Sequence, residues 1–473
     1  MTIKKLCSKL LILLFIVCIL SRILSSIFYI EDIDSLRFAL SLYEFNIVEL
    51  QPHFPGYPIF VALAKAFYSI INNMGGTFSL IGGISLFILI VFTLKLFGIS
   101  PHSSFGLLSI ITILLNPFIW IMSNRYMPDL MGVSVSVASM YFLTIKPKRL
   151  NFLLIGFFLA GILCGTRLSY LPILLILLIF HTIKSNERYK LFFSFSIGCV
   201  LWLIPMILMT GFENLYLAAL KQTAGHFNDF GGTIVTEGTW HRRISNMIRS
   251  IWADGLGGFW LGRSWHTLFI SLIMGYFYYH AFMSVKNKKL NQQYLLILGS
   301  IVFYGLWIFF FQNIIYKSRH ILPLISFLIV FLNLGIKRLR NENKLIGNIL
   351  VGLYLISLCN VTYVLTSQHK KPNAISSVKD FIIKQDINYS IVSIPLINFY
   401  LKSHGLKNEF FDIEDITNSE PIKALARDSL LIVGNFQNKF SDDYINTYDT
   451  TFYHNPYVNR MWSELGIVNL KKK

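Results

Sequence analysis

The stretch that decides the fold runs from Ile30 to Phe60 and reads IEDIDSLRFALSLYEFNIVELQPHFPGYPIF. It follows the first long apolar run of the chain and opens with Glu31, Asp32 and Asp34 within four positions. Ionisable side chains beside a membrane are costly to bury, so they are a functional-site hypothesis by default. We interpret residues 31–58 as a functional loop on the outer side of a membrane.

Two local elements are predicted within this stretch. The mixture of apolar and polar positions from Leu36 to Ile47 predicts a helix that is too short to cross a membrane and lies in its interface. In the turn His53-Phe54-Pro55-Gly56-Tyr57-Pro58, two prolines fix φ and a glycine permits a tight bend. The turn therefore brings a histidine and a tyrosine beside the acidic cluster.

The composition places the chain in a membrane. Of its 473 residues, 54% are hydrophobic and 41 are Phe, and the mean hydropathy is +0.57. Repeated apolar runs of about 20 residues match the thickness of a bilayer. Nearly all of the net charge of +18 lies before residue 367, because residues 367–473 hold 13 Lys and Arg against 12 Asp and Glu. This bias is the positive-inside pattern of a polytopic membrane protein, and it argues against a nucleic-acid partner.

The basic clusters assign one topology, with the amino terminus in the cytoplasm. Residues 59–71 are short for a crossing and are interpreted as an outer-leaflet or re-entrant helix, because a full crossing would turn every later basic cluster outward. The chain has about eleven predicted spans in total, and this odd number places the tail outside. The spans cover approximately residues 10–30, 77–97, 103–123, 128–145, 151–166, 170–183, 192–210, 267–285, 294–315, 321–336 and 345–365.

The composition becomes that of a soluble domain from about residue 367. Apolar runs at 390–396 and 430–434 predict buried strands, and residues 377–385 and 421–428 predict helices, which together indicate a small α/β domain. No catalytic motif is found in it. A solvated acidic face is predicted at Glu409, Asp412, Glu414 and Asp415. All five cysteines lie in or beside apolar runs, so no disulfide framework is predicted.

Four short motifs follow the first span in a fixed order, each on the predicted outer side. They are Asp32-x-Asp34-x-x-Arg37-Phe38-Ala39, His53-x-Pro55-Gly56-Tyr57-Pro58, Arg125-x-x-x-Asp129 and Arg319-His320-x-x-Pro323. This order resembles the GT-C superfamily of polytopic glycosyltransferases that use polyprenyl-phosphate sugars. Protein O-mannosyltransferases and lipid A aminoarabinose transferases are the members most similar in pattern. The resemblance covers the first ten spans, and the chain has Asp34-Ser35 where the family often has Asp-Glu.

The resemblance implies the architecture and the reaction. Residues 1–366 would form a GT-C-like, α-helical transmembrane domain with outer loops 31–58 and 211–265, and residues 367–473 an extracytoplasmic α/β domain. The protein would be an inverting glycosyltransferase that moves a sugar from a polyprenyl-phosphate donor to a glycan, lipid or protein acceptor. Its other partners would be membrane lipids, and its location a plasma membrane, with a bacterial inner membrane favoured by the compact loops.

Three carboxylates are candidates for catalysis. The resemblance places Asp34 at the catalytic base, with Asp32 as the near alternative and Asp129 as a second acid facing the first loop. A base that takes the acceptor proton is what an inverting displacement from a lipid phosphate requires. The competing interpretation is that Asp32 or Asp34 caps the following helix, and that Asp129 is a favourable charge at a helix N-terminus.

Cationic and aromatic side chains at the outer ends of spans are candidates for substrate binding. Guanidinium groups make paired hydrogen bonds to phosphate oxygens, although the same residues also reach lipid headgroups by snorkelling. The candidates for the donor phosphate are Arg125, Arg167, Arg319 and His320. The further candidates for the substrate are His53, Tyr57, His226, Arg242 and Arg243, the last three in a predicted lid for which an interfacial aromatic belt is the alternative.

No cofactor is required by this chemistry, although Asp32, Asp34 and His53 offer the oxygen and nitrogen ligands that a divalent cation accepts. An oligosaccharide ligase or polymerase would share the Arg-rich outer face, and a transporter would use a site between repeated halves. No internal repeat is found, and an acidic cluster directly after the first span favours transfer from a monosaccharide-lipid. The sequence does not identify the sugar or the acceptor.

Overall fold

The computed structural model describes residues 3–146, 149–229, 231–286, 288–314, 316–385, 389–413, 422 and 429–473. The chain divides into two compact units. The first comprises Met1–Ile27 and Phe38–Ser367, and the second Phe28–Arg37 and Gln368–Lys473. The acidic segment that opens the predicted outer loop 31–58 therefore belongs to the same unit as the tail.

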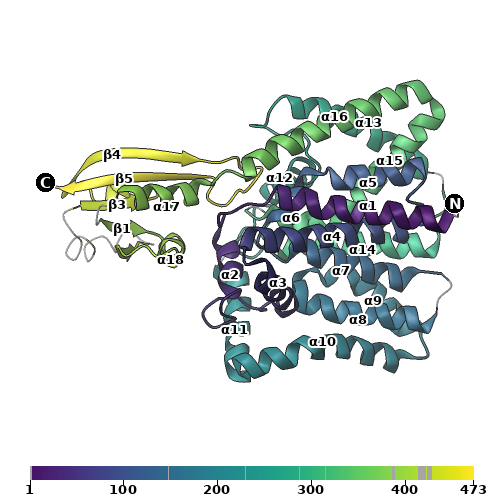
Figure 1. The fold of residues 1–473 in the computed structure, drawn as a ribbon, viewed down its shortest axis with the longest axis horizontal. Coiled ribbons are helices and arrows are strands. Elements are labelled where there is room, and N and C mark those ends of the chain that lie inside the picture. Colours follow the sequence, from purple (N-terminus) through teal and green to yellow (C-terminus); the bar gives the residue numbers. More distant parts are fainter. Residues whose placement is uncertain are drawn as a thin grey trace. The chain divides into compact units, whose positions relative to one another are not determined.

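The first unit consists almost wholly of helices, drawn in purple to green in Figure 1. They are α1 (Ile3–Leu24), α3 (Pro58–Ile71), α4 (Met74–Leu96), α5 (Ser104–Leu114), α6 (Pro117–Asn124), α7 (Asp129–Thr144), α8 (Leu150–Arg167), α9 (Pro172–Lys184), α10 (Arg188–Thr210), α11 (Phe212–Ala224), α12 (Trp240–Arg249), α13 (His266–Val285), α14 (Gln292–Phe311) and α15 (Leu322–Glu342). Two further helices, α2 (Ile33–Ser41) and α16 (Lys344–His369), have residues in both units.

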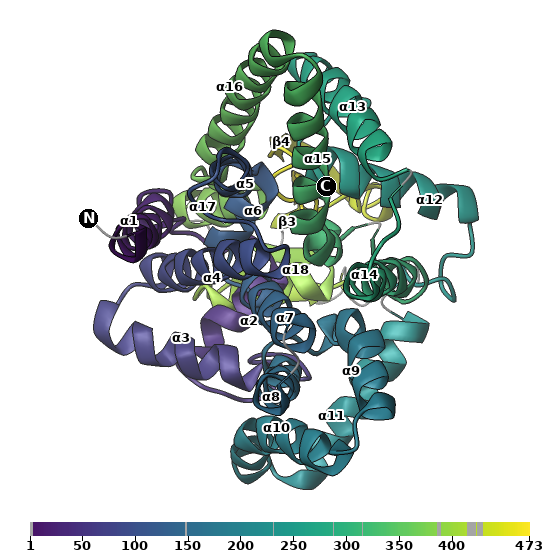
Figure 2. The ribbon, with the colours of Figure 1, turned by 90° about the vertical axis from the view of Figure 1, so that its right-hand side faces the viewer.

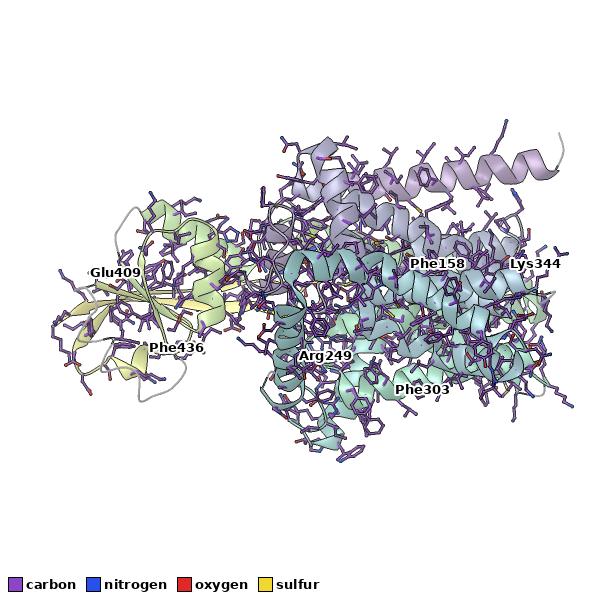
Figure 3. The ribbon with its side chains drawn as sticks, turned by 90° about the horizontal axis from the view of Figure 1, so that it is seen from below. Phe158, Arg249, Phe303, Lys344, Glu409 and Phe436 are labelled. Carbon is purple, nitrogen blue, oxygen red and sulfur yellow. The ribbon has the colours of Figure 1, made fainter. Side chains whose placement is uncertain are left out.

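The helical unit has the length and composition of a multi-pass membrane protein, which confirms the predicted fold class. Seven of the described helices are long and apolar enough to cross a bilayer, or eight if the bent pair α5–α6 is one span. The apolar helices α3, α7 and α9 are shorter. Apolar side chains such as Phe303 on α14, which is 38% exposed, cover the outside of this unit (Figure 3). The total of eleven spans stays a prediction.

Helices that are not consecutive in the chain pack as neighbours in this unit. Helix α4 lies between α1 and α7, and α8 lies between α7 and α10, while α9 packs on α14 and α13 on α15 (Figure 2). Close approach of α4 and α6 depends on a glycine, because a Cβ at Gly82 would lie 1.7 Å from the carbonyl oxygen of Ser123. Small residues at such crossings allow membrane helices to pack backbone to backbone.

The prediction of one continuous helix at 103–123 is wrong. The helix is broken into α5 and α6, which meet at an angle of 54°. Pro117 has no N–H to donate and disfavours a helical residue before it, so the helix ends ahead of the proline. Asn116 restarts the chain by capping α6, since its Oδ1 accepts from the N–H of Ile119 at 2.9 Å. Arg22 satisfies the carbonyl of Leu114 at the end of α5.

Two predicted loop elements differ from the structure. Helix α2 begins and ends earlier than the predicted 36–47, and Leu36, Phe38 and Ala39 are almost fully buried, so it does not lie as an exposed amphipathic helix. The loop 211–265 is largely helical. Besides α11 and α12 it contains two π-helical turns, η2 (Gly225–Asp229) and η3 (Ser250–Gly255).

The second unit contains a sheet with the strand order β2-β1-β3-β5-β4 (Figure 1). Its strands are β1 (Ser390–Ser393), β2 (Glu409–Asp412), β3 (Ser429–Val433), β4 (Tyr444–Tyr453) and β5 (Glu464–Lys472). The first three are parallel, with Ser390 opposite both Glu409 and Leu430, and β3, β5 and β4 are antiparallel. Helices α17 (Ala374–Gln385) and α18 (Pro395–Ser403) complete the described part, whose core includes Val392, Leu430 and Phe440.

Local chemistry explains where the tail differs from its predicted elements. The strand predicted at 390–396 ends at Ser393, because Pro395 suits the first turn of a helix and begins α18. Strands β2, β4 and β5 carry polar residues at most exposed positions, so their apolar signal is weak. Glu409 and Asp412 are exposed at the ends of β2, and Figure 3 labels the former. The predicted Glu414 and Asp415, and all of 421–428 except Ile422, lie outside the described residues.

Replacing Gly82 with Ala tests the close contact of α4 with α6. We expect a loss of about 1–3 kcal/mol, as in an overpacked core, measured as a lower melting temperature of the purified protein in detergent. The matched control is Gly305→Ala in α14, where a Cβ would meet nothing within 4 Å. Equal melting temperatures for the two variants would contradict the predicted contact.

Candidate active site

A buried carboxylate lies at the centre of the candidate site in the helical unit. Asp129 is the first residue of α7 and is 1% exposed. Its Oδ1 lies 3.1 Å from Nη2 of Arg167 and accepts a hydrogen bond of 2.9 Å from the hydroxyl of Tyr170. Nε of Arg319 lies 3.9 Å from the same oxygen. Asp129 therefore has partners on other elements. The competing interpretation, a favourable charge at a helix N-terminus, does not account for them.

These partners come from three elements that end near one another. Arg167 is the last residue of α8, and Tyr170 ends the 3₁₀ turn η1 (Leu168–Tyr170) that follows it. Arg319 belongs to η4 (Ser318–Ile321), which precedes α15. The hydroxyl of Tyr170 also lies 3.2 Å from the carbonyl oxygen of Arg319, and that of Tyr304 donates to the carbonyl of His320 at 2.8 Å. Both tyrosines thereby hold η4 in place.

Two buried guanidinium groups approach this carboxylate. Arg167 and Arg319 are 5% and 7% exposed, and they share one carboxylate. Among the described residues, the second oxygen of Asp129 has no hydrogen-bond partner. Guanidinium groups make paired hydrogen bonds that fit the oxygens of a phosphate. The cluster can therefore bind a phosphate and hold it away from water.

The turn predicted from the opening stretch joins this cluster. Nη1 of Arg167 donates to the hydroxyl oxygen of Tyr57 at 3.0 Å, and that oxygen lies 3.0 Å from Nε2 of His53. The ring of Phe38 packs edge-on against both His53 and Tyr57. The contacts thus connect His53, Tyr57, Arg167 and Asp129 in one chain of polar groups.

A glycine makes this turn possible. Gly56 has a φ of +81°, in the region that favours glycine, and a Cβ there would lie 2.8 Å from Cδ1 of Ile47. Ile47 in turn belongs to a core cluster with Met206 of α10 and Leu215 of α11. The turn is therefore packed against two helices, which fixes Tyr57 where α3 begins.

The acidic segment lies in the second unit and has partners of its own. Asp32 is the N-cap of α2, since its Oδ1 accepts from the N–H of Ser35 at 2.8 Å, and its Oδ2 accepts from Nδ2 of Asn459 at 3.1 Å. Glu31 lies 3.1 Å from Nε2 of His369. Asp34, in the first turn of α2, lies 3.7 Å from Nη1 of Arg37. The carboxylate of Asp34 thus lies beside the guanidinium of Arg37, a residue of the same helix.

The remaining predicted residues have different surroundings. Arg125 ends α6 and His320 is in η4, and both are buried. His226 lies 2.7 Å from the carbonyl oxygen of Phe311, and Arg242 is half exposed, 3.8 Å from Glu237. The predicted roles of these four residues in substrate binding stay predictions.

Arg243 is fully buried and donates to backbone carbonyls. Its partners are Phe309 at 3.0 Å, Gly232 at 2.7 Å and Gln312 at 3.3 Å. Two of these lie at the C-terminal end of α14, where carbonyls lack helical partners and a cation is favourable. The contacts give Arg243 a structural role, and substrate binding by it stays a prediction.

Tyr170, Tyr304 and Asp254 contribute to this region and were missed by the sequence reasoning. Tyr170 opens a predicted span and Tyr304 lies inside one, so both read as apolar positions. Asp254 is 5% exposed in η3, which packs against η4. An acidic residue within the predicted loop 211–265 is a sequence signal from which Asp254 could have been chosen as a candidate. In the described part of the chain, no three His, Cys, Asp or Glu side chains group as a metal site, so a cation at Asp32, Asp34 and His53 stays a prediction.

Solved structures share this fold. No family model and no curated protein sequence matches the chain. The structure of ArnT from Cupriavidus metallidurans bound to undecaprenyl phosphate matches with a TM-score of 0.56 and 10% identity, over 98% of this chain and 97% of that one. ArnT in the apo state matches with a TM-score of 0.55 and 10% identity, over 98% of each chain. The chain thus shares the fold of ArnT over nearly its whole length, the tail included.

Replacing Asp129 with Asn tests the central ion pairs. We expect a loss of about 3–5 kcal/mol, because two buried guanidiniums would lose their shared counter-ion, measured as a lower melting temperature of the purified protein. The control is Glu187→Gln, which removes a half-exposed pair with Lys190 and should cost about 0–1 kcal/mol. If Asp129→Asn melts at the temperature of the control, Asp129 does not hold the two arginines.

Proposed function

We propose that this protein is an inverting membrane glycosyltransferase that transfers a sugar from a polyprenyl-phosphate donor to an extracytoplasmic acceptor. The observation that carries the proposal is the buried cluster in which Arg167 and Arg319 both approach the carboxylate of Asp129. The fold supports it, because the similar ArnT structure was solved with undecaprenyl phosphate bound.

The arginines would act on the leaving group. In the proposed step the acceptor hydroxyl attacks the anomeric carbon, the bond from that carbon to the phosphate oxygen breaks, and polyprenyl phosphate departs. Negative charge grows on the phosphate as the bond breaks, so Arg167 and Arg319 would stabilise the transition state more than the ground state. Arg125 and His320 remain candidates for further contacts with the phosphate.

The three candidate acids would then have different roles. Asp129 accepts hydrogen bonds from Tyr170 and pairs with arginines, which suits a carboxylate that orients cations rather than one that takes a proton. Both oxygens of Asp32 accept hydrogen bonds within its own unit. Asp34 keeps the role that the resemblance implies, that of the base for the acceptor proton.

Replacing Asp34 with Asn tests the proposed base. Purified protein in lipid nanodiscs would be given a panel of polyprenyl-phosphate sugars with candidate acceptors, and released polyprenyl phosphate would be measured. We expect turnover of one donor class by the wild type and a fall of about 10²–10⁴-fold in Asp34→Asn, the usual contribution of a general base. Asp449→Asn, an exposed change on β4, is the control. Unchanged turnover in Asp34→Asn would remove Asp34 from the mechanism.

Binding of the product tests the phosphate site separately from the reaction. Undecaprenyl phosphate should raise the melting temperature of the wild type, because a ligand that binds only the folded protein stabilises it. We expect this increase to be largely lost in Arg319→Gln and Arg167→Gln, each compared with its own ligand-free melting temperature. Arg188→Gln, an exposed change at the start of α10, serves as the control. An equal increase in all four proteins would show that the lipid binds elsewhere.

A further inference from the structure

The acidic segment before α2 is held by residues that follow it by more than 330 positions. Residues Phe28–Arg37 belong to the second unit, called the tail unit below, which is otherwise formed by Gln368–Lys473. The hydroxyl of Tyr29 donates to the carbonyl of His369 at 2.9 Å, and Nδ2 of Asn373 donates to the carbonyl of Glu31. These contacts hold the side chain of Tyr29 and the backbone of Glu31, the residues on either side of Ile30.

A third contact fixes Ile30 itself. The hydroxyl of Tyr400, in α18, donates to the carbonyl oxygen of Ile30. Burial raises the pKa of Tyr400 well above its usual range, so the hydroxyl keeps its proton and stays a donor. Three consecutive residues, Tyr29 to Glu31, therefore take their position from the tail unit.

The side chains of this segment are held as firmly as its backbone. Glu31 and His369 are 1% and 2% exposed and lie 3.1 Å apart. Oδ2 of Asp32 accepts from Asn459, while its Oδ1 caps α2. The carboxylate of Asp32 therefore connects the start of α2 to the tail unit, and Asp34 is two residues further along that first turn.

The orientation of Asn459 is determined by its second contact. Its Oδ1 accepts from the N–H of Met461 at 3.0 Å, so the amide nitrogen must face Asp32. The turn that carries Asn459 is itself anchored, because Nδ2 of Asn455 donates to Oε1 of Gln368 at 2.6 Å. Asn459 is thus a preorganised donor aimed at one carboxylate oxygen.

We propose that Asn459 is a positioning residue: by its hydrogen bond to Asp32 it sets the start of α2 and hence the place of the Asp34 carboxylate. This inference rests on the proposed function, since it gives the tail unit a part in that reaction. A catalytic group displaced by about 1 Å can lose about 10²-fold in rate, so a positioning contact matters although it touches no substrate. Asp34 remains the catalytic residue, and Asn459 acts through Asp32.

Two variants of Asn459 and one control test the inference in the full-length protein. Asn459→Ala removes the donor, and Asn459→Asp has nearly the same shape but places a carboxylate beside Asp32. Asn408→Ala is the control, because Asn408 donates to the carbonyl of Tyr389 within the same unit and does not contact the acidic segment. Deuterium uptake of residues 28–41 and the kcat and KM for the donor are measured for each.

We expect Asn459→Ala to raise deuterium uptake in residues 28–41 and to lower kcat about 10–100-fold with little change in KM. Asn459→Asp should lose activity at neutral pH and regain part of it as the pH falls, because adjacent carboxylates that share a proton restore the hydrogen bond. The Asn408→Ala variant should match the wild type in both measurements.

The two measurements separate failure of the inference from failure of the proposed function. Unchanged uptake in Asn459→Ala overturns the inference, whether or not the protein has transferase activity. Raised uptake with a wild-type kcat, or the same pH profile for Asn459→Asp and Asn459→Ala, overturns it as well. A wild type that releases polyprenyl phosphate from no donor overturns the proposed function, while the uptake still reports whether Asn459 holds the segment.

Discussion

The helical unit depends on one constraint, the burial of the Asp129 carboxylate. An isolated charge in an apolar interior is prohibitively costly, so it must be met by partners with good geometry. Arg167, Tyr170 and Arg319 meet it, and they come from the end of α8, from η1 and from η4. The ends of three separate segments are thereby held at the start of α7. The same contacts bring two guanidinium groups to one carboxylate, and guanidinium groups also suit a phosphate.

Buried polar groups in both units are satisfied across long separations in sequence. In the helical unit Arg167 reaches Tyr57, and Asn116 donates to the carbonyl of Gly255. In the tail unit Glu31 pairs with His369, and Asp32 with Asn459. Each such contact contributes a modest net free energy to folding. Removing one partner is costly, because the other is left buried without its hydrogen bond. These polar contacts act together with apolar packing, such as that of Ile47 on α10 and α11, in positioning the candidate segments.

Similar residues have different roles because their partners differ. Arg167 and Arg243 are both buried arginines from outer segments, and both were predicted to bind substrate. Arg167 faces the carboxylate of Asp129 and the phenol of Tyr57. Arg243 faces the carbonyl oxygens at the end of α14 and completes that helix. Among the acids, Asp32 caps a helix and Asp34, two positions later, does not, so residue type alone could not separate these roles.

The sequence by itself determined the membrane class, the positions of most helices and the change to a sheet-containing tail, since these follow from apolar period, run length and composition, which are local. It also pointed to Asp129, Arg167, Arg319 and the turn at His53–Tyr57 as polar groups at segment ends. Only the tertiary structure decided which of these meet, that Tyr170 completes the cluster, and that residues 28–37 belong with the tail. The physical reason is that a hydrogen bond or ion pair between distant segments depends on how the chain packs, and no local pattern encodes its partner.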